Sequence, residues 1–264
     1  MIIDIHTHAW PEKVSQKARE SLESFFKIKL VGDPTVTTLE RCMKKNSIDV
    51  SVVCAVASRP EQVKSINDWA FSIRSGRIKV FASFHPGYES WKDELARIKK
   101  NADGIKLQPE FQDFYVDDEM VFPAYEEMER LGLPVLFHCG EELSGTMLVR
   151  SSAKRIWNVK RRFKKLNIIA AHFGGFRLWD EVKEFLLGKD IYLDTAFFFQ
   201  HLPVGEIIEM IKAHPAERIL FGTDFPLVDQ ADDIRFLRGL DISPEAKGKI
   251  FGANAARLLN LKLE

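Results

Sequence analysis

The sequence has no excess of charge of either sign and few cysteines. Its 38 lysine and arginine residues balance 38 aspartate and glutamate residues, so no net field favours nucleic acid or an anionic membrane. The three cysteines, Cys42, Cys54 and Cys139, are an odd number and form no Cys-x-x-Cys pair. This usage fits a reducing cytosol better than a disulfide framework. We therefore expect no nucleic-acid partner and no stabilising disulfide bonds.

Long hydrophobic runs are also missing. No stretch of the chain approaches the roughly 20 apolar residues that cross a bilayer. The first residues, Met1 to Asp4, lack the basic segment and the long apolar run of a signal peptide. The sequence thus predicts a cytoplasmic globular protein with no membrane partner. We expect it to act on a small-molecule substrate, with a homo-oligomer left open.

The chain has no Gly-x-Gly-x-x-Gly after its first β-rich run, which argues against a dinucleotide-binding sheet. What it has instead is strand and helix patterns that alternate from end to end, without a break in composition. This alternation predicts parallel pairing, and about eight strands in 264 residues favour a (β/α)₈ TIM barrel over an open doubly wound sheet. We expect one domain over residues 1–264. The predicted strands lie in residues 1–8, 49–54, 78–84, 104–107, 134–138, 167–172, 191–194 and 218–224.

The first β–α connection is predicted to be enlarged. Residues 10–35 separate the first strand from its helix, and only Ser21 to Phe26 suggest a short helix there. Long loops in compact domains are often functional, so this segment is either a lid or a plain surface elaboration.

The first strand carries the pair His6 and His8. Successive side chains of a strand alternate between its faces, so these two imidazoles should share one face while Ile3 and Ile5 face the helices. Two imidazoles held by rigid backbone can grip a divalent metal. The alternative is a pair of ordinary hydrogen-bonded histidines.

Other polar residues also fall at the carboxyl ends of predicted strands. Lys106 lies in the fourth predicted strand, and His138, His172 and Asp224 end the fifth, sixth and eighth. Apolar residues of the same strands, such as Ile105, Phe137 and Phe221, point the other way from Lys106, His138 and Asp224. In a closed barrel these side chains meet at the mouth, where barrel enzymes place their chemistry. Burying each without a shared partner would cost about 1–3 kcal/mol per group. Histidines and a carboxylate that meet at the mouth instead predict a Zn²⁺-type site with positions open to water.

At these residues the chain resembles the amidohydrolase superfamily, in particular the amidohydrolase-related branch that includes predicted metal-dependent hydrolases and aminocarboxymuconate-semialdehyde decarboxylase. The resemblance spans the whole chain and implies a distorted (β/α)₈ barrel with a metal at its mouth. The matching segments are Asp4-Ile5-His6-Thr7-His8, Gly104-Ile105-Lys106-Leu107-Gln108-Pro109, Pro134-Val135-Leu136-Phe137-His138-Cys139-Gly140, Ala171-His172-Phe173-Gly174-Gly175, Phe221-Gly222-Thr223-Asp224-Phe225-Pro226 and Phe251-Gly252-Ala253-Asn254-Ala255-Ala256-Arg257-Leu258.

The resemblance also implies roles for single residues. His6, His8, His138 and Asp224 correspond to metal ligands, and His172 to a ligand or an active-site base. A lysine at the position of Lys106 is carboxylated and bridges two metals in binuclear relatives. The alternative is a lysine that pairs with Asp224 or with the substrate.

These residues predict a hydrolase that uses a divalent metal, Zn²⁺ before Mn²⁺ or Fe²⁺. A bound metal lowers the pKa of water from 15.7 to about 7, and Asp224 can then shuttle a proton to the leaving group of a small amide, ester or lactone. His172 would polarise the scissile bond or orient the water. One alternative is metal-dependent, non-oxidative decarboxylation of a small unsaturated or aromatic acid. Another is a non-catalytic barrel that binds a metal or ligand.

Two residues are predicted to contact the substrate. Arg177, in the loop after His172, could hold a carboxylate, and Trp10 suits an apolar or aromatic ring. Arg59 and Arg150 are weaker candidates for the same carboxylate.

Overall fold

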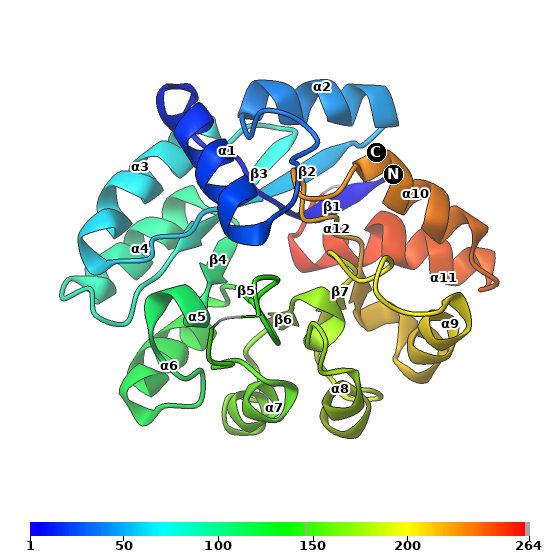
Figure 1. Ribbon diagram of the computed structural model, residues 1–264. Coiled ribbons are helices and arrows are strands. Elements are labelled where there is room, and N and C mark those ends of the chain that lie inside the picture. Colours follow the sequence, from blue (N-terminus) through cyan, green and yellow to red (C-terminus); the bar gives the residue numbers. More distant parts are fainter. Residues whose placement is uncertain (146, 262–264) are drawn as a thin grey trace.

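The computed structural model describes residues 1–145 and 147–261, and its eight strands form one parallel sheet that curves into a barrel (Figure 1). Each strand pairs with the next one along the chain. The barrel closes where Ile5 N donates to Phe221 O at 2.9 Å and Thr7 forms a parallel bridge with Phe225. The predicted barrel is therefore confirmed. The strands are β1 (Ile3–Thr7), β2 (Val50–Cys54), β3 (Ile78–Ser83), β4 (Gly104–Leu107), β5 (Val135–Phe137), β6 (Ile168–Ala170), β7 (Tyr192–Asp194) and β8 (Ile219–Leu220).

Helices connect the strands and surround the barrel in Figure 1. Among the described residues, no helix is long and apolar enough to cross a membrane. The helices are α1 (Glu12–Phe26), α2 (Val36–Asn46), α3 (Val63–Ile73), α4 (Trp91–Asn101), α5 (Pro109–Gln112), α6 (Phe122–Leu131), α7 (Ala153–Arg162), α8 (Trp179–Phe185), α9 (Val204–Ala213), α10 (Gln230–Gly239), α11 (Pro244–Gly248) and α12 (Asn254–Leu258).

The segment before β5 shows how the sequence sets the ends of an element. Pro123 lies in the first turn of α6, where its missing N–H costs no helical hydrogen bond. Gly132 follows the helix with φ of 64°, a left-handed conformation that glycine adopts without strain, and its N–H donates to Glu129 O and Met128 O. Strand β5 therefore begins shortly after α6 ends, and His138 follows β5 at the barrel mouth.

Two apolar cores hold the barrel. One lies between the helices and the outer faces of the strands and contains Leu39, Val80 and Phe137. The other fills the inside of the barrel below the mouth and contains residues of β1, β2, β3, β5, β6, β7 and β8 together with Ala255 and Ala256 of α12. Ile3 and Ile5 belong to this inner core, so the prediction that they face the helices is wrong.

A β-bulge in β1 explains that error. Ile3 and Asp4 pair with Val50 and Ser51, but Thr7 pairs with Val53, so β1 holds one extra residue between Asp4 and Thr7. The extra residue breaks strict alternation. Ile5 therefore points into the barrel core, while the next residue, His6, also points inwards and lines the mouth.

The enlarged first connection is confirmed, but its helix is longer than the short segment predicted from Ser21 to Phe26. Helix α1 begins at Glu12, has no buried residue and lies in front of the strands in Figure 1. Ion pairs one turn apart, such as Arg19 with Glu23, stabilise a helix whose sequence is mostly polar. Leu22 and Phe26 line the cavity at the barrel mouth, so α1 forms part of the cavity wall.

We predict that His214 makes the protein acid-sensitive. Burial lowers its pKa from 6.5 to about 4, and its Nε2–H donates to Ile191 O at 3.0 Å. The unfolded chain takes up this proton near pH 6.5, so the stabilising contribution is complete above pH 6.5 and is lost as the pH falls towards 4. At pH 5 the expected loss is about 2 kcal/mol of unfolding free energy.

His214→Gln keeps a donor and should remove that loss. Urea unfolding of metal-free wild type and variant at pH 8 and pH 5 measures it, because all other titrating groups are common to both proteins. Equal pH dependence in the two proteins would contradict the assignment.

Candidate active site

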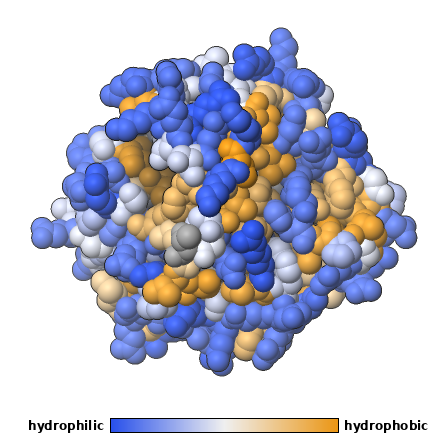
Figure 2. Space-filling view, viewed as in Figure 1, coloured by the Kyte–Doolittle hydropathy of each residue, from blue (hydrophilic) through white to orange (hydrophobic). Residues whose placement is uncertain are grey.

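The strand ends bring the candidate residues to one cavity of about 210 Å³ at the barrel mouth. His6 and His8 come from β1 and the residue after it, Lys106 comes from β4, and His138, His172 and Asp224 follow β5, β6 and β8. Figure 2 shows this face of the molecule, with apolar side chains gathered near its centre among polar ones. All six side chains line the cavity, as the alternation of strands and helices predicted.

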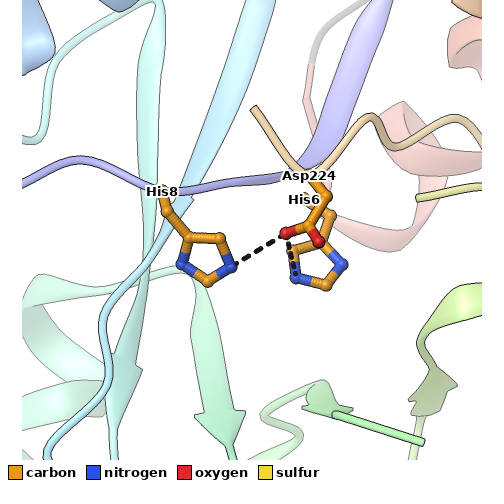
Figure 3. Close-up of side chains that lie close together, drawn as sticks. All are labelled: His6, His8 and Asp224. Carbon is orange, nitrogen blue, oxygen red and sulfur yellow. Dashed lines mark ion pairs between the residues drawn. The ribbon is translucent and has the colours of Figure 1, made fainter. Parts of the chain in front are cut away.

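Three of these residues form a compact group (Figure 3). Asp224 Oδ1 lies 3.2 Å from His8 Nε2 and 3.6 Å from His6 Nε2. The possible ligand atoms of His6, His8 and Asp224 all lie within 4.8 Å of one another. His6 is buried and Asp224 is 7 % exposed, while the His8 side chain is 14 % exposed.

The hydrogen bonds behind the two imidazoles place a hydrogen on Nδ1 of each ring. His6 Nδ1 donates to Asp194 Oδ2 at 2.9 Å, and His8 Nδ1 donates to the carbonyl of Cys54 at 3.0 Å. Burial and the nearby Lys106 ammonium lower the pKa of His6 well below its usual value, so this ring is neutral. Its Nε2 is therefore a lone pair aimed at the group, and the neutral form of His8 presents Nε2 in the same way.

This donor set fits a divalent metal ion. Two imidazole lone pairs facing a carboxylate oxygen repel one another unless a cation lies among them. Imidazole nitrogen and carboxylate oxygen are ligands of Zn²⁺, Mn²⁺ and Fe²⁺, and three protein ligands leave positions open, as in catalytic sites. His6, His8 and Asp224 would hold the ion, with Asp194 and the Cys54 carbonyl orienting the two rings.

The Asp224 side chain is a carboxylate anion. Burial by itself raises its pKa, but positive charge on the neighbouring His6, His8 and His172 rings, whenever they are protonated, outweighs burial and lowers the pKa well below its usual range. Its backbone has φ of 66°, a conformation that L-residues rarely adopt and that is concentrated at functional sites.

Lys106 is buried and contacts a different partner from the one anticipated. Its Nζ lies 3.2 Å from His6 Nε2, where the ammonium donates to the imidazole lone pair. The side chain is 1 % exposed. A metal on His6 would take over that lone pair and free the ammonium for another acceptor in the cavity.

His138 and His172 form a second, connected pair. His172 Nδ1 donates to the carbonyl of Ala196 at 2.9 Å, and burial lowers its pKa, so its Nε2 accepts from His138 Nδ1 at 3.0 Å. His138 Nε2 then faces Glu142 Oε1 at 3.3 Å and Glu110 Oε2 at 4.0 Å. The structure thus groups His138 with two carboxylates and apart from the group around Asp224.

Three carboxylates of the site were missed in the sequence. Asp194 ends β7 in the same way as the other candidates end their strands, and that position was the available signal. Glu110 lies in α5 and Glu142 follows His138 by four residues, both outside the regular strand pattern. Burial, with the neighbouring Glu110 as a second cause, raises the pKa of Glu142 to about 8, and burial also raises the pKa of Glu110.

The two proposed substrate contacts lie in different places. Trp10 lines the cavity beside His8, with ring centroids 6.1 Å apart. The Arg177 side chain is 43 % exposed, stacks its guanidinium on Phe176 and lies 3.7 Å from Glu141, outside the cavity lining. Arg59 and Arg150 pair with Glu61 and Asp113 instead.

The cavity wall is mainly aromatic and aliphatic. Of the described residues that line it, none is an arginine, and Lys106 is the one with an ammonium group. Besides the six candidate side chains, the polar residues of the lining are Gln108, Glu141 and Glu142. The apolar part of the lining is Trp10, Leu22, Phe26, Val56, Phe111, Leu143, Phe176, Phe197 and Leu227.

The family model described as amidohydrolase matches residues 3–261 of this sequence. This chain is an enzyme of the amidohydrolase family. The match covers all the strands and every candidate ligand, which confirms the resemblance drawn from the motifs. Among curated protein sequences, none matches the chain significantly.

Solved structures share the fold of this amidohydrolase-family enzyme at low identity. An uncharacterized TIM-barrel protein from Bordetella bronchiseptica is 18% identical, with a TM-score of 0.77 and 98% of each chain covered. A 5-carboxyvanillate decarboxylase from Sphingomonas paucimobilis is 17% identical, with a TM-score of 0.73 and 99% of each chain covered. A dihydroxybenzoic acid decarboxylase from Polaromonas, solved with manganese and 2-nitroresorcinol, is 17% identical, with a TM-score of 0.74, 100% of this chain and 98% of that chain covered.

We predict that Asp194→Asn weakens metal binding by about 10- to 100-fold, the usual effect of losing a carboxylate that orients a ligating histidine. The amide can still accept from the backbone N–H groups of His172 and Ala196, which Asp194 Oδ1 now serves, so the fold should persist. Competition with a chromophoric chelator measures the affinity. Asp103→Asn is the control, because this carboxylate, 8 % exposed, pairs with Arg74 and lies just before β4, away from the mouth. Wild-type affinity in Asp194→Asn would show that Asp194 does not orient His6.

Proposed function

We propose that this enzyme catalyses metal-dependent, non-oxidative decarboxylation of a small aromatic acid. The observation that carries the proposal is the buried Lys106 ammonium beside the metal-type group of His6, at the base of an aromatic-walled cavity. A substrate carboxylate has no arginine to bind among the described lining residues, so the lysine and a cation held by His6 and His8 are its partners. Two of the solved structures that share the fold are decarboxylases of aromatic acids.

The residues of the cavity have separate roles in the proposed reaction. His6, His8 and Asp224 hold the divalent ion, which when bound supplies positive charge to an anionic substrate group and to the charge that develops as a bond breaks. Lys106 holds the substrate carboxylate, and Trp10 packs against the ring. The bond from the ring carbon to the carboxylate breaks, CO₂ leaves, and the electron pair on the carbon takes a proton.

Asp224 is the proposed carrier of that proton. A carboxylate has two oxygens, so Asp224 can face the ion with Oδ1 while Oδ2, ionised at rest, takes a proton from water and passes it to the ring carbon. His172 lies on the other side of the group, with its ring centroid 5.3 Å from that of His6. The Ala196 carbonyl holds His172 in the tautomer with the hydrogen on Nδ1, which leaves its Nε2 as an acceptor.

Hydrolysis remains a second candidate because of one feature, the low pKa of Asp224. An ionised carboxylate beside a metal site can accept a proton from water and pass it to the leaving group of an amide, ester or lactone. Both reactions use the same residues, so the product decides between them.

The deciding experiment is a substrate panel on Mn²⁺- and Zn²⁺-loaded enzyme in ¹⁸O-labelled water. We expect hydroxylated or amino-substituted benzoates to release CO₂ without ¹⁸O in the ring product. The same panel contains aryl amides, esters and lactones. Incorporation of ¹⁸O from solvent into one of those products, with no CO₂ from any acid, would overturn decarboxylation in favour of hydrolysis.

We predict that Lys106→Met raises KM for the decarboxylated substrate by about 10- to 100-fold, the scale of one hydrogen bond to a charged group. The substitution keeps the apolar stem that fills the barrel and removes only the ammonium. Bound metal is counted on the same preparations. Lys160→Met is the matched control, because that buried lysine bonds the carbonyls of Lys164 and Leu166 on the outside of the barrel. Loss of metal in parallel with activity in Lys106→Met would instead make Lys106 a ligand, as in relatives with a carboxylated lysine.

A further inference from the structure

Three consecutive phenylalanines follow β7, and they serve different parts of the molecule. Phe198 and Phe199 are 0 % and 4 % exposed and belong to the outer core, whereas Phe197 lines the cavity. Phe198 stacks on Phe173 and Phe199 on Phe236, with ring centroids 4.2 Å and 4.9 Å apart. Of the three rings, only that of Phe197 therefore faces the substrate space.

The backbone conformation of Phe197 has a cost that the fold does not require. Its φ is 54°, in the left-handed region that bulky side chains rarely adopt. Glycine adopts this conformation without strain, so the turn after β7 would form more easily without the phenylalanine side chain. Strained residues are concentrated at functional sites. We therefore attribute the Phe197 ring to the cavity and not to the fold.

The surrounding contacts keep this strained loop in one conformation. Phe173, in the neighbouring loop after β6, is also left-handed, with φ of 51°, and its ring lies almost parallel to that of Phe198, at 8°. The Ala196 carbonyl, just before Phe197, accepts from His172 Nδ1 at 2.9 Å. The chain is thus fixed on both sides of Phe197, which is the condition under which a strained residue persists.

Other rings support Phe197 on the cavity wall. Its ring centroid lies 5.5 Å from that of Phe176 and 4.7 Å from that of His201. The Phe176 ring lies in turn 6.3 Å from the His172 ring, so Phe197 is one aromatic ring away from the candidate reacting groups. The cavity measures only about 210 Å³. A ring that is supported by its neighbours in so small a space limits the size of what can bind.

We propose that Phe197 is a specificity-determining residue, which packs on the ring of the substrate and restricts the cavity to acids with a single ring. Aromatic rings attract one another in offset or edge-to-face contacts, so the contact favours a flat ring as well as limiting its size. Removal of the Phe197 side chain would open space for a second fused ring. The inference rests on the proposed function, because it takes the substrate to be an aromatic acid.

The test compares the binding of two acids to Mn²⁺-loaded enzyme by isothermal titration calorimetry. The single-ring acid is 2-hydroxybenzoate and the two-ring acid is 1-hydroxy-2-naphthoate. Wild type should bind the single-ring acid more tightly. Phe197→Ala should bind it about 2- to 10-fold more weakly, the scale of one lost aromatic contact, and should bind the two-ring acid more tightly than wild type does.

Two further variants separate the ring from the conformation of the loop. Phe197→Gly should show the same change of preference as Phe197→Ala but a Tm a few °C higher, because glycine adopts φ of 54° without strain. Ser47→Gly is the matched control for the backbone, since Ser47 is exposed at the end of α2 and also has φ of 54°. It should gain stability and keep the wild-type preference.

Phe199→Leu is the control for a phenylalanine of the same loop with a purely structural role. It should lower Tm through the lost contact with Phe236 and leave the ratio of the two Kd values unchanged.

The outcomes distinguish this inference from the proposed reaction. A ratio of Kd values that is the same in wild type, Phe197→Ala and Phe197→Gly would overturn the role of Phe197, as would a wild type that binds neither acid. The expected change in binding without release of CO₂ would uphold that role and reject decarboxylation. Release of CO₂ with an unchanged preference in the variants would uphold decarboxylation and reject the role of Phe197.

Discussion

The closure of the barrel between β8 and β1 is the constraint on which the site depends. Backbone bonds join the two ends of the chain, with Asp224 N donating to His6 O at 2.9 Å and His8 N donating to Phe225 O at 2.7 Å. Outside the barrel, the Asp4 carboxylate accepts from Thr223 Oγ1 at 2.7 Å and from Gln230 Nε2 at 2.8 Å. Residues more than two hundred positions apart are thereby fixed to within a hydrogen bond, which is what brings Asp224 to the two imidazoles.

The same closure carries an electrostatic cost. Burial raises the pKa of Asp4 to about 7 even though it accepts several hydrogen bonds, because the carboxylate lies wholly inside the protein. Asp194 is similar, with a pKa that burial raises to about 6. Both carboxylates act from behind the site, Asp4 by holding the β1–β8 seam and Asp194 by orienting His6. The cavity is thus surrounded by acceptors and carboxylates, so cations from outside are the natural complement to its lining.

Much of this could be predicted from the sequence, because barrel strands and their polar ends have a local signature. The eight predicted strands, alternating with helices, indicated the barrel fold. The apolar residues that face away from Lys106, His138 and Asp224 in the same strands indicated that these three side chains lie at the mouth. The direction of Ile5 could not be predicted, since a single extra residue in β1 reverses the alternation and leaves no mark on composition. Helix α1 was underestimated for a different reason: Val14, Ala18, Leu22 and Phe26 recur at helical spacing, but polar residues outnumber the apolar ones in this segment.

The rest of the site depends on contacts that no local pattern encodes. Which nitrogen of each histidine carries a hydrogen is set by carbonyls and carboxylates from other strands, such as Ala196 for His172 and Asp194 for His6. These bonds turn the lone pairs of His6 and His8 towards Asp224 and turn that of His138 away, towards Glu110 and Glu142. Four histidines and one aspartate look equivalent in the sequence, namely His6, His8, His138, His172 and Asp224. The hydrogen bonds that the other nitrogen of each ring makes divide them into two groups, one around Asp224 and one around His138. The chemistry of the cavity follows from that sorting, because an imidazole can bind a cation only through the nitrogen that its partner leaves free.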